Sequence, residues 1–249
     1  MQALADSGAI EPARSFERAA AAYESARPSY PLALLDVLPI DTGSTVLDLG
    51  AGTGKLTRVL AGRYRHVIAV EPLDGMRAIL ESVVPAAESH AGAAESIPLS
   101  DSSVDAVFAA QAFHWFANDE AIAEIARVVR PGGIFAVVWN ESVDPSPLPD
   151  AYRARIKELF ADGRLAAGTD GERFAAIARG PFGELCEKSV MHEQVQDRDS
   201  ALAYLSSVSL VARLPDDERL ATLAELRSLL PAGEYRFSIR ATVRWAVRA

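Results

Sequence analysis

Three glycines at alternate positions follow a short apolar run near residue 50. The run from Val46 to Leu49 favours a β-strand, and the glycines are Gly50, Gly52 and Gly54. Apolar residues at helical spacing come next, so the pattern predicts a strand, a tight turn and a helix start. Glycines allow positive φ and let a ligand lie directly against the backbone. The sequence therefore predicts a ligand site at this turn, beyond the carboxyl end of the first strand.

The residues around the turn limit the kind of ligand. A phosphate-binding Walker loop needs Ser or Thr after its lysine, but Leu56 follows Lys55, and the glycines lack the Gly-x-Gly-x-x-Gly spacing of NAD sites. Asp48 is unfavourable beside a pyrophosphate, whereas it suits an ammonium group. Glu71 ends the next apolar run, 71 − 50 = 21 residues after Gly50, where a carboxylate can accept hydrogen bonds from ribose hydroxyls. A nucleoside with an amino-acid tail and no phosphate fits these demands.

The stretch Val-Leu-Asp-Leu-Gly-Ala-Gly-Thr-Gly, residues 46–54, resembles motif I of the class I S-adenosylmethionine-dependent methyltransferases. Glu71 stands where that family keeps its ribose-binding acid, and residues 93–105 resemble its adenine-side loop and the approach to its fourth strand. The resemblance implies S-adenosylmethionine as cofactor and S-adenosylhomocysteine as product. It also implies an α/β fold, with a doubly wound, Rossmann-like, mostly parallel seven-stranded sheet, an antiparallel last strand, an N-terminal helical lid and a helical insertion after strand five.

Residues 23–31, Tyr-Glu-Ser-Ala-Arg-Pro-Ser-Tyr-Pro, are similar to the N-terminal lid of the trans-aconitate methyltransferase-like (methyltransferase type 11) subgroup. In that subgroup the segment closes over the cofactor, while the alternative here is a surface helix and linker. Taken together, the resemblance implies a set of cofactor-binding residues: Tyr23, Arg27, Asp48, Gly50, Ala51, Gly52, Thr53, Gly54, Glu71, Pro72, Met76, Ala94, Glu95 and Gln111.

Aromatic residues follow the fourth predicted strand, at the same sheet edge as the glycine turn. We expect Gln111 to reach the methionine moiety, and His114 and Trp115 to face the acceptor, together with Tyr30 and Trp139. His114 is the one candidate for catalytic acid–base chemistry. It could take a proton from a hydroxyl acceptor, position a carboxylate, or only pack against Trp115, and the residues leave these alternatives open.

Other chemistries find little support. The ends of the fourth and fifth predicted strands lack the carboxylates of metal-dependent methyltransferases, and four histidines with one cysteine give no zinc spacing, so we expect no metal. No Gly-x-Ser-x-Gly elbow occurs. The net charge of −9 disfavours a nucleic-acid partner. With Cys186 as the single cysteine, and with neither a signal peptide nor an apolar span, we expect a cytoplasmic location, no membrane partner, and a monomer or homodimer.

These residues need a parallel α/β core to bring them together, and the apolar patterns predict one. We expect strands at about 45–49, 66–71, 88–91, 106–110 and 134–139, within 185–195, and at 235–248, with helices between them. The predicted division is a lid segment at 1–42, a cofactor-binding core at 43–141, a cap insertion at 142–181 and the C-terminal part of the core at 182–249.

The sequence thus predicts a methyltransferase that acts on a small-molecule acceptor by direct methyl transfer. Two alternatives remain: a tRNA, rRNA or protein methyltransferase, and a non-catalytic S-adenosylmethionine-binding protein. An intact motif I and ribose acid disfavour the second.

Overall fold

The computed structural model describes residues 24, 27–143, 147–160, 170–206, 211 and 214–249. The chain divides into two compact units. Unit 1 comprises Met1–Pro28, Glu141–Ala166 and Met191–Ile239, and unit 2 comprises Ser29–Asn140, Ala167–Val190 and Arg240–Ala249. The glycine turn belongs to unit 2.

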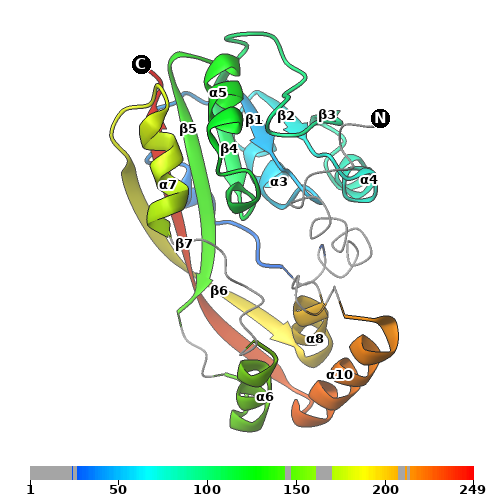
Figure 1. Cartoon of the computed structure of the whole chain (residues 1–249). Coiled ribbons are helices and arrows are strands. Elements are labelled where there is room, and N and C mark those ends of the chain that lie inside the picture. The colour runs from blue at the N-terminus through cyan, green and yellow to red at the C-terminus, as the bar shows by residue number, and fades with distance from the viewer. Residues whose placement is uncertain (1–23, 25–26, 144–146, 161–169, 207–210, 212–213) are drawn as a thin grey trace. The chain divides into compact units, whose positions relative to one another are not determined.

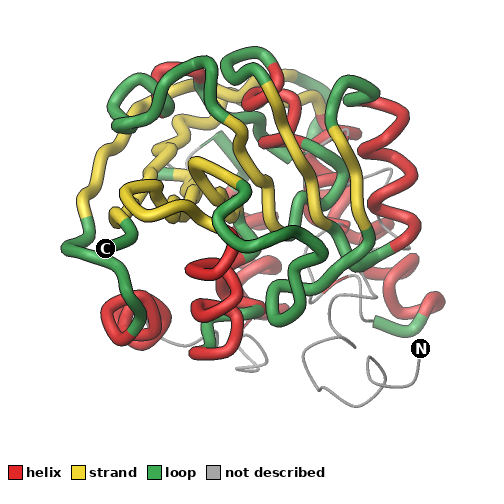
Figure 2. Tube along the Cα trace, turned by 90° about the horizontal axis from the view of Figure 1, so that it is seen from above, coloured by secondary structure: helices red, strands yellow, loops and turns green. Residues whose placement is uncertain are grey.

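Strands and helices alternate through unit 2 (Figures 1 and 2). Its elements are the short 3-10 helix η1 (Leu32–Leu34), β1 (Thr45–Leu49), α3 (Lys55–Ala61), β2 (His66–Val70), α4 (Asp74–Val83), β3 (Glu88–His90), β4 (Val104–Ala110), the 3-10 helix η2 (Phe113–Trp115), α5 (Asp119–Val128) and α7 (Asp170–Arg179). Unit 1 holds α6 (Asp150–Phe160), α8 (Arg198–Ser206) and α10 (Asp216–Leu229). Three long strands have residues in both units: β5 (Val129–Ser142), β6 (Cys186–Asp197) and β7 (Glu234–Val247).

The seven strands form one sheet in the order β3-β2-β1-β4-β5-β7-β6. The first five strands pair in parallel. Two backbone hydrogen bonds show that β7 runs antiparallel to β5. Gly132, near the start of β5, donates to the carbonyl of Arg248, and Val143, just after its end, donates to the carbonyl of Ser238. The predicted doubly wound fold is therefore confirmed, and the strand order reverses beside β1, where such folds bind ligands.

Each face of the parallel strands is covered by its own hydrophobic core, which explains why these strands read as continuous apolar runs. In β1, Leu47 and Leu49 face the core that includes α5 and α7, while Val46 faces the core that includes η1 and α3. Figure 1 shows α5 and α7 beside each other over β4 and β5. None of the helices in the described part of the chain has the length and apolar character that crossing a bilayer requires.

The predicted elements match the observed ones closely, apart from β5. The sequence predicted this strand at 134–139, but the strand spans Val129–Ser142. Residues 130–133 end helix α5, as expected, yet they also join the strand, since Gly132 takes a φ of 79° and its N–H donates to the carbonyl of Arg248, the residue after β7. Partners on a distant strand thus extend β5 beyond its local apolar pattern.

The division into lid, core, cap insertion and C-terminal part stays a prediction, and the two compact units group the chain by its own contacts. Helix α7, within the predicted cap insertion 142–181, belongs to unit 2, because Ile177 is buried in the core beside α5 and Arg179 pairs with Asp119 at 2.6 Å. Unit 1 has a separate core from α6, α8, α10 and β7, which includes Tyr152 and Leu226.

Candidate active site

The glycine turn after β1 adopts the conformation that its composition predicts. Gly50, Gly52 and Gly54 have φ values of 70°, 57° and 89°, where residues with a Cβ are strained. A Cβ on Gly50 would lie 2.9 Å from the Cβ of Ala112, and one on Gly54 would lie 3.2 Å from the side chain of Leu80. A Cβ on Gly52 would meet nothing within 4 Å. Packing therefore explains two glycines, whereas the open side of Gly52 fits a ligand lying on the backbone.

Glu71 lies directly against this turn. Its Oε2 accepts a hydrogen bond of 2.8 Å from the N–H of Gly52, and its Oε1 accepts one of 3.0 Å from the N–H of Leu73. The side chain is fixed, with only 5% of the residue exposed. A carboxylate oxygen can accept two hydrogen bonds, so these two donors do not by themselves exclude a ribose hydroxyl as a further partner.

Asp48 is buried at the end of β1 and points toward α3. Its Oδ2 accepts a hydrogen bond of 2.7 Å from the hydroxyl of Thr57, whereas its Oδ1 is buried and has no hydrogen-bond partner among the described residues. Burial raises the pKa of Asp48 to about 7. The hydrogen bond from Thr57 lowers this pKa, whereas the charge of Glu71 raises it. A buried carboxyl oxygen without a donor fits a cofactor that carries an ammonium group.

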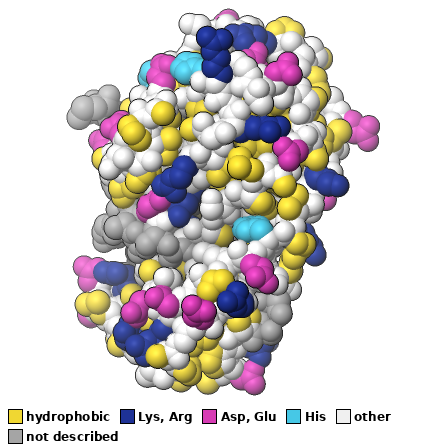
Figure 3. Space-filling view, turned by 180° about the vertical axis from the view of Figure 1, so that it is seen from behind, with side chains coloured by type: hydrophobic (Ala, Val, Ile, Leu, Met, Phe, Trp, Pro, Cys, Tyr) yellow, Lys and Arg dark blue, Asp and Glu magenta, His cyan; other side chains and the backbone are white. Residues whose placement is uncertain are grey.

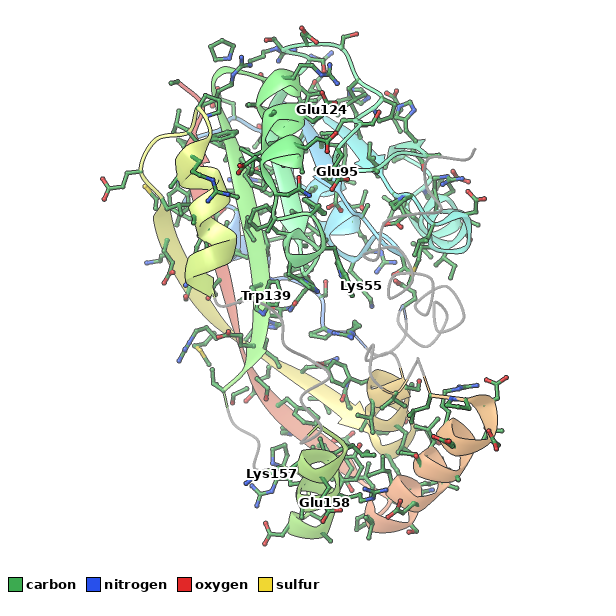
Figure 4. The ribbon with its side chains drawn as sticks, in the orientation of Figure 1. Lys55, Glu95, Glu124, Trp139, Lys157 and Glu158 are labelled. Carbon is green, nitrogen blue, oxygen red and sulfur yellow. The ribbon has the colours of Figure 1, made fainter. Side chains whose placement is uncertain are left out.

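The loop after β3, which resembles the adenine-side loop, is held by side chains of α5 and of its N-cap residue. Asn118 donates 2.9 Å to Glu95, and Glu124 accepts 3.0 Å from the N–H of Ile97. Arg127 donates 2.9 Å to the carbonyl of Ile97 and pairs with Glu124, whose pKa it lowers. Figure 4 shows Glu95 on the loop and Glu124 on the helix.

Sequence reasoning missed these three anchors. The sequence indicates only their places on the helix. Asn118 precedes two acidic residues, as a helix N-cap would, and Glu124 and Arg127 are three residues apart, on the same side of the helix. Nothing local indicates that they hold a loop more than twenty residues earlier in the chain.

The remaining predicted cofactor residues take varied positions. Thr53 is completely buried, Ala51, Met76 and Ala94 are buried as well, and Pro72 is exposed. Arg27, in unit 1, lies 4.9 Å above the ring of Tyr204. Tyr23 lies outside the described residues.

Gln111, directly after β4, has a φ of 54°, which is unusual for a residue with a side chain. Its N–H donates 3.0 Å to the carbonyl of Val138, and its side-chain Nε2 donates 2.8 Å to the carbonyl of Asn140. The side chain of Asn140 in turn donates 3.1 Å to the carbonyl of Ser29. Strain of this kind is kept where surrounding contacts enforce it, and it is concentrated at functional sites. Asn140 is a further residue, beyond Asn118, Glu124 and Arg127, that the sequence did not identify.

The predicted acceptor residues separate into an aromatic group and a core residue. The ring centroid of His114, on η2, lies 4.7 Å from that of Trp115 and 5.3 Å from that of Trp139. Trp139 comes from β5, while Lys55 begins α3 (Figure 4). Tyr30 is buried in the core that includes Phe108, so little of its surface can reach a ligand.

Across the part of the chain that the structure describes, no three His, Cys, Asp or Glu side chains gather as metal ligands would. The fixed carboxylate of Glu71, the open side of Gly52 and the buried carboxyl of Asp48 are compatible with S-adenosylmethionine.

Comparisons with known proteins also indicate a methyltransferase. A methyltransferase domain model matches residues 47–137. An uncharacterised methyltransferase of Mycobacterium bovis is 38% identical over 218 residues, covering 87% of this chain and 85% of its own length. A malonyl-[acyl-carrier protein] O-methyltransferase of Methylococcus capsulatus is 41% identical over 115 residues, which is 44% of this chain and 42% of that protein.

A solved structure extends the match to the fold. A protein from Anaeromyxobacter dehalogenans, assigned as a type II methyltransferase, has a TM-score of 0.61 and 30% identity, and the alignment covers 89% of this chain and 97% of that one. Motif, fold and relatives lead to the same result: this chain belongs to the class I S-adenosylmethionine-dependent methyltransferases.

Proposed function

We propose that this methyltransferase acts on a small-molecule acceptor by direct methyl transfer. The observation that carries the proposal is the aromatic group of His114, Trp115 and Trp139 beside the strained Gln111. These residues follow β4 or end β5, and the carboxyl ends of parallel strands are where this fold keeps its ligands. Aromatic rings packed against one another in tilted and edge-on arrangements offer an apolar contact surface of the kind that small organic acceptors need.

The bound cofactor supplies a methyl group activated on a sulfonium, so the protein's task is alignment. Holding donor and acceptor in line can lower the barrier by roughly 7–11 kcal/mol. In this proposal Glu71 and the backbone at Gly52 bind the ribose, Asp48 serves the ammonium group, and Gln111 holds the methionine end. The hydrogen bonds that Glu71 accepts from the N–H groups of Gly52 and Leu73 support this assignment, since they fix the acid before any ligand arrives.

His114 has three possible roles in the proposal. A neutral imidazole can take the proton of a hydroxyl acceptor, an effect worth about 10²–10⁴-fold in rate. It can instead position a carboxylate that needs no base. Packing alone is the third role, and the contacts with Trp115 and Trp139 are compatible with each of them.

Charge favours a small acceptor over a nucleic acid. The chain carries a net charge of −9, and on the face seen in Figure 3 basic and acidic side chains are interspersed. Binding to a phosphate backbone relies on a concentration of basic side chains. The partial relative named for malonyl-[acyl-carrier protein] supports a further possibility, a carboxyl acceptor presented by a carrier protein.

The test is release of S-adenosylhomocysteine from S-adenosylmethionine. Separate reactions would contain pooled small hydroxyl, amine and carboxyl compounds, malonyl-acyl carrier protein, tRNA, rRNA or a protein extract. We expect release with a small-molecule pool. Release confined to tRNA, rRNA or protein extract would contradict the proposal, and cofactor binding without release in any reaction would favour the non-catalytic alternative.

A further inference from the structure

Gln111 lies between the glycine turn and the aromatic group of the candidate site. The next residue, Ala112, is packed against the turn, since a Cβ on Gly50 would lie 2.9 Å from the Cβ of Ala112. The side chain of Gln111 extends to β5, where its Nε2 donates 2.8 Å to the carbonyl of Asn140. Trp139, a member of the aromatic group, directly precedes Asn140 on β5. All of these residues belong to unit 2.

The amide group of Gln111 has a fixed orientation. The carbonyl oxygen of Asn140 can only accept a hydrogen bond, so the amide nitrogen must face it and the Oε1 oxygen must point away from it. The backbone is fixed as well, because the N–H of Gln111 donates 3.0 Å to the carbonyl of Val138 and holds the residue at a φ of 54°. Main chain and side chain are thus both fastened to β5.

The Oε1 oxygen is the open part of this amide. It accepts no hydrogen bond within the described part of the chain, and it is not enclosed as the Oδ1 of Asp48 is. Gln111 as a residue is partly exposed. An amide oxygen accepts hydrogen bonds and donates none, so a ligand beside it has to supply an N–H or O–H group. The amide nitrogen, which could donate to an anion, is already bonded to Asn140.

The direction of the side chain favours the methyl acceptor as that ligand. In the sheet, β4 lies between β1 and β5. The glycine turn follows β1, whereas the side chain of Gln111 leads from the end of β4 toward β5 and the aromatic group. The methionine end of the cofactor and the acceptor meet at the transferred methyl group, so a residue that holds the first can also contact the second.

We propose that the Oε1 oxygen of Gln111 accepts a hydrogen bond from the methyl acceptor, which therefore presents a hydroxyl or neutral amine group. This inference rests on the proposed function and narrows its substrate class. A hydroxyl oxygen or amine nitrogen whose hydrogen is bonded to Gln111 keeps a lone pair for the methyl group. A carboxylate has no hydrogen to donate, and its charge would face the negative end of the amide dipole. Gln111 thus selects hydroxyl and amine acceptors over acids.

The competing explanation is that the amide only fastens β4 to β5, and two substitutions separate the explanations. Gln111→Met keeps the volume of the side chain and removes both polar groups. Gln111→Lys removes the acceptor oxygen and keeps a donor for the carbonyl of Asn140. Ser102→Lys is the control, because it adds the same charge at the other end of β4, at a residue that also has a positive φ. Melting temperatures establish that each variant is folded.

Binding would be measured by saturation-transfer NMR on the full chain, at a concentration of S-adenosylhomocysteine that saturates each variant by isothermal titration. Phenol and aniline carry a hydrogen-bond donor on an aromatic ring, anisole lacks the donor, and benzoate is an anion. We expect wild type and Ser102→Lys to bind phenol and aniline about tenfold more tightly than anisole or benzoate. Gln111→Met should lose this preference, and Gln111→Lys should prefer benzoate.

The inference would be overturned if wild type bound no probe or bound benzoate as tightly as phenol, or if Gln111→Met kept the preference. Loss of the preference in Gln111→Met but not in Gln111→Lys would show that the amide only fastens the strands, which also overturns it. Failure of the proposed function gives a different result, namely release of S-adenosylhomocysteine only with tRNA, rRNA or protein extract. Release with the small-molecule pool, without a preference for phenol, would remove this inference alone.

Discussion

The N–H of Gly52 donates a hydrogen bond of 2.8 Å to the carboxylate of Glu71. This bond joins the turns that follow two adjacent parallel strands, β1 and β2. The same carboxylate also accepts the N–H of Leu73, so it is held in one orientation without a ligand. Because the acid is already positioned, ligand binding does not have to order it.

Replacing Glu71 should weaken cofactor binding. Glu71→Ala removes the proposed partner of the ribose hydroxyls, and we expect a loss of about 1–3 kcal/mol in the affinity for S-adenosylhomocysteine, measured by isothermal titration. Glu187→Ala, which removes a surface carboxylate paired with Arg244, should leave the affinity unchanged. Equal affinity of Glu71→Ala and wild type would mean that the ribose lies elsewhere.

Two glycines allow a matched test of the open turn. Gly52 and Gly132 have φ values of 57° and 79°, and a Cβ on either would meet nothing within 4 Å. Gly52→Ala and Gly132→Ala should therefore lose similar stability, about 1–2 kcal/mol in urea unfolding. Only Gly52→Ala should lose cofactor affinity. A similar effect of both substitutions on affinity would make Gly52 a purely structural glycine.

Relief of backbone strain should separate stability from function at Gln111. Gln111 and Ser102 are the residues other than glycine with positive φ among those described, at 54° and 50°. Glycine accepts this conformation without strain, so Ser102→Gly should raise the melting temperature or leave it unchanged and preserve activity. Gln111→Gly should also stay folded, because the relief of backbone strain offsets the loss of the hydrogen bond to Asn140. Its turnover, however, should fall at least tenfold. Full activity of Gln111→Gly would remove Gln111 from the site.

His114→Ala distinguishes the three roles of the imidazole. A base would show a fall of about 10²–10⁴-fold in turnover at unchanged cofactor affinity, with partial recovery at high pH. Positioning would show as a raised Michaelis constant for the acceptor. If neither quantity changes, the ring only packs between Trp115 and Trp139.

Asp48 should make stability depend on pH. Its folded-state pKa of about 7 lies above its ordinary value of 3.8, so the unfolded state releases this proton first as the pH rises. The contribution of Asp48 to the free energy of unfolding therefore falls between about pH 4 and pH 7, by up to about 4 kcal/mol, and is constant above that range.

Asp48→Asn removes this titration and keeps an acceptor for the hydroxyl of Thr57. Urea unfolding of both proteins across this pH range should show the variant gaining stability relative to wild type as the pH rises. Curves that stay parallel would show that Asp48 has an ordinary pKa.

The glycine turn and Glu71 could be predicted because their requirements are local. Positive φ selects glycine, and an acid at the end of the next strand reaches the same sheet edge through parallel pairing alone. The contact from Gln111 to Asn140 and on to Ser29 could not be predicted, since it joins three distant segments and needs a glutamine in a conformation that no sequence pattern indicates.

The segment that contains α6 and α7 shows the same limit. Helices α6 and α7 have similar short apolar patterns, and only long-range contacts, such as that of Arg179 with Asp119, place α7 with the core beside α5. The residue types along the second half of β6 also gave little indication of its covered face, because Met191 and Val195 are exposed there while Gln196 is buried.

The sheet order also determines when the chain can finish folding during its synthesis. β7 is made after both β5 and β6, yet it lies between them in the sheet. When residues 186–197 leave the ribosome, β6 has no neighbour to pair with, and β5 still exposes one edge. Both strands must wait for Glu234–Val247, a long-range pairing of the kind that folds slowly and leaves strand edges open to aggregation. A nascent chain stalled before residue 234 should therefore depend on chaperones, whereas one carrying β7 should not.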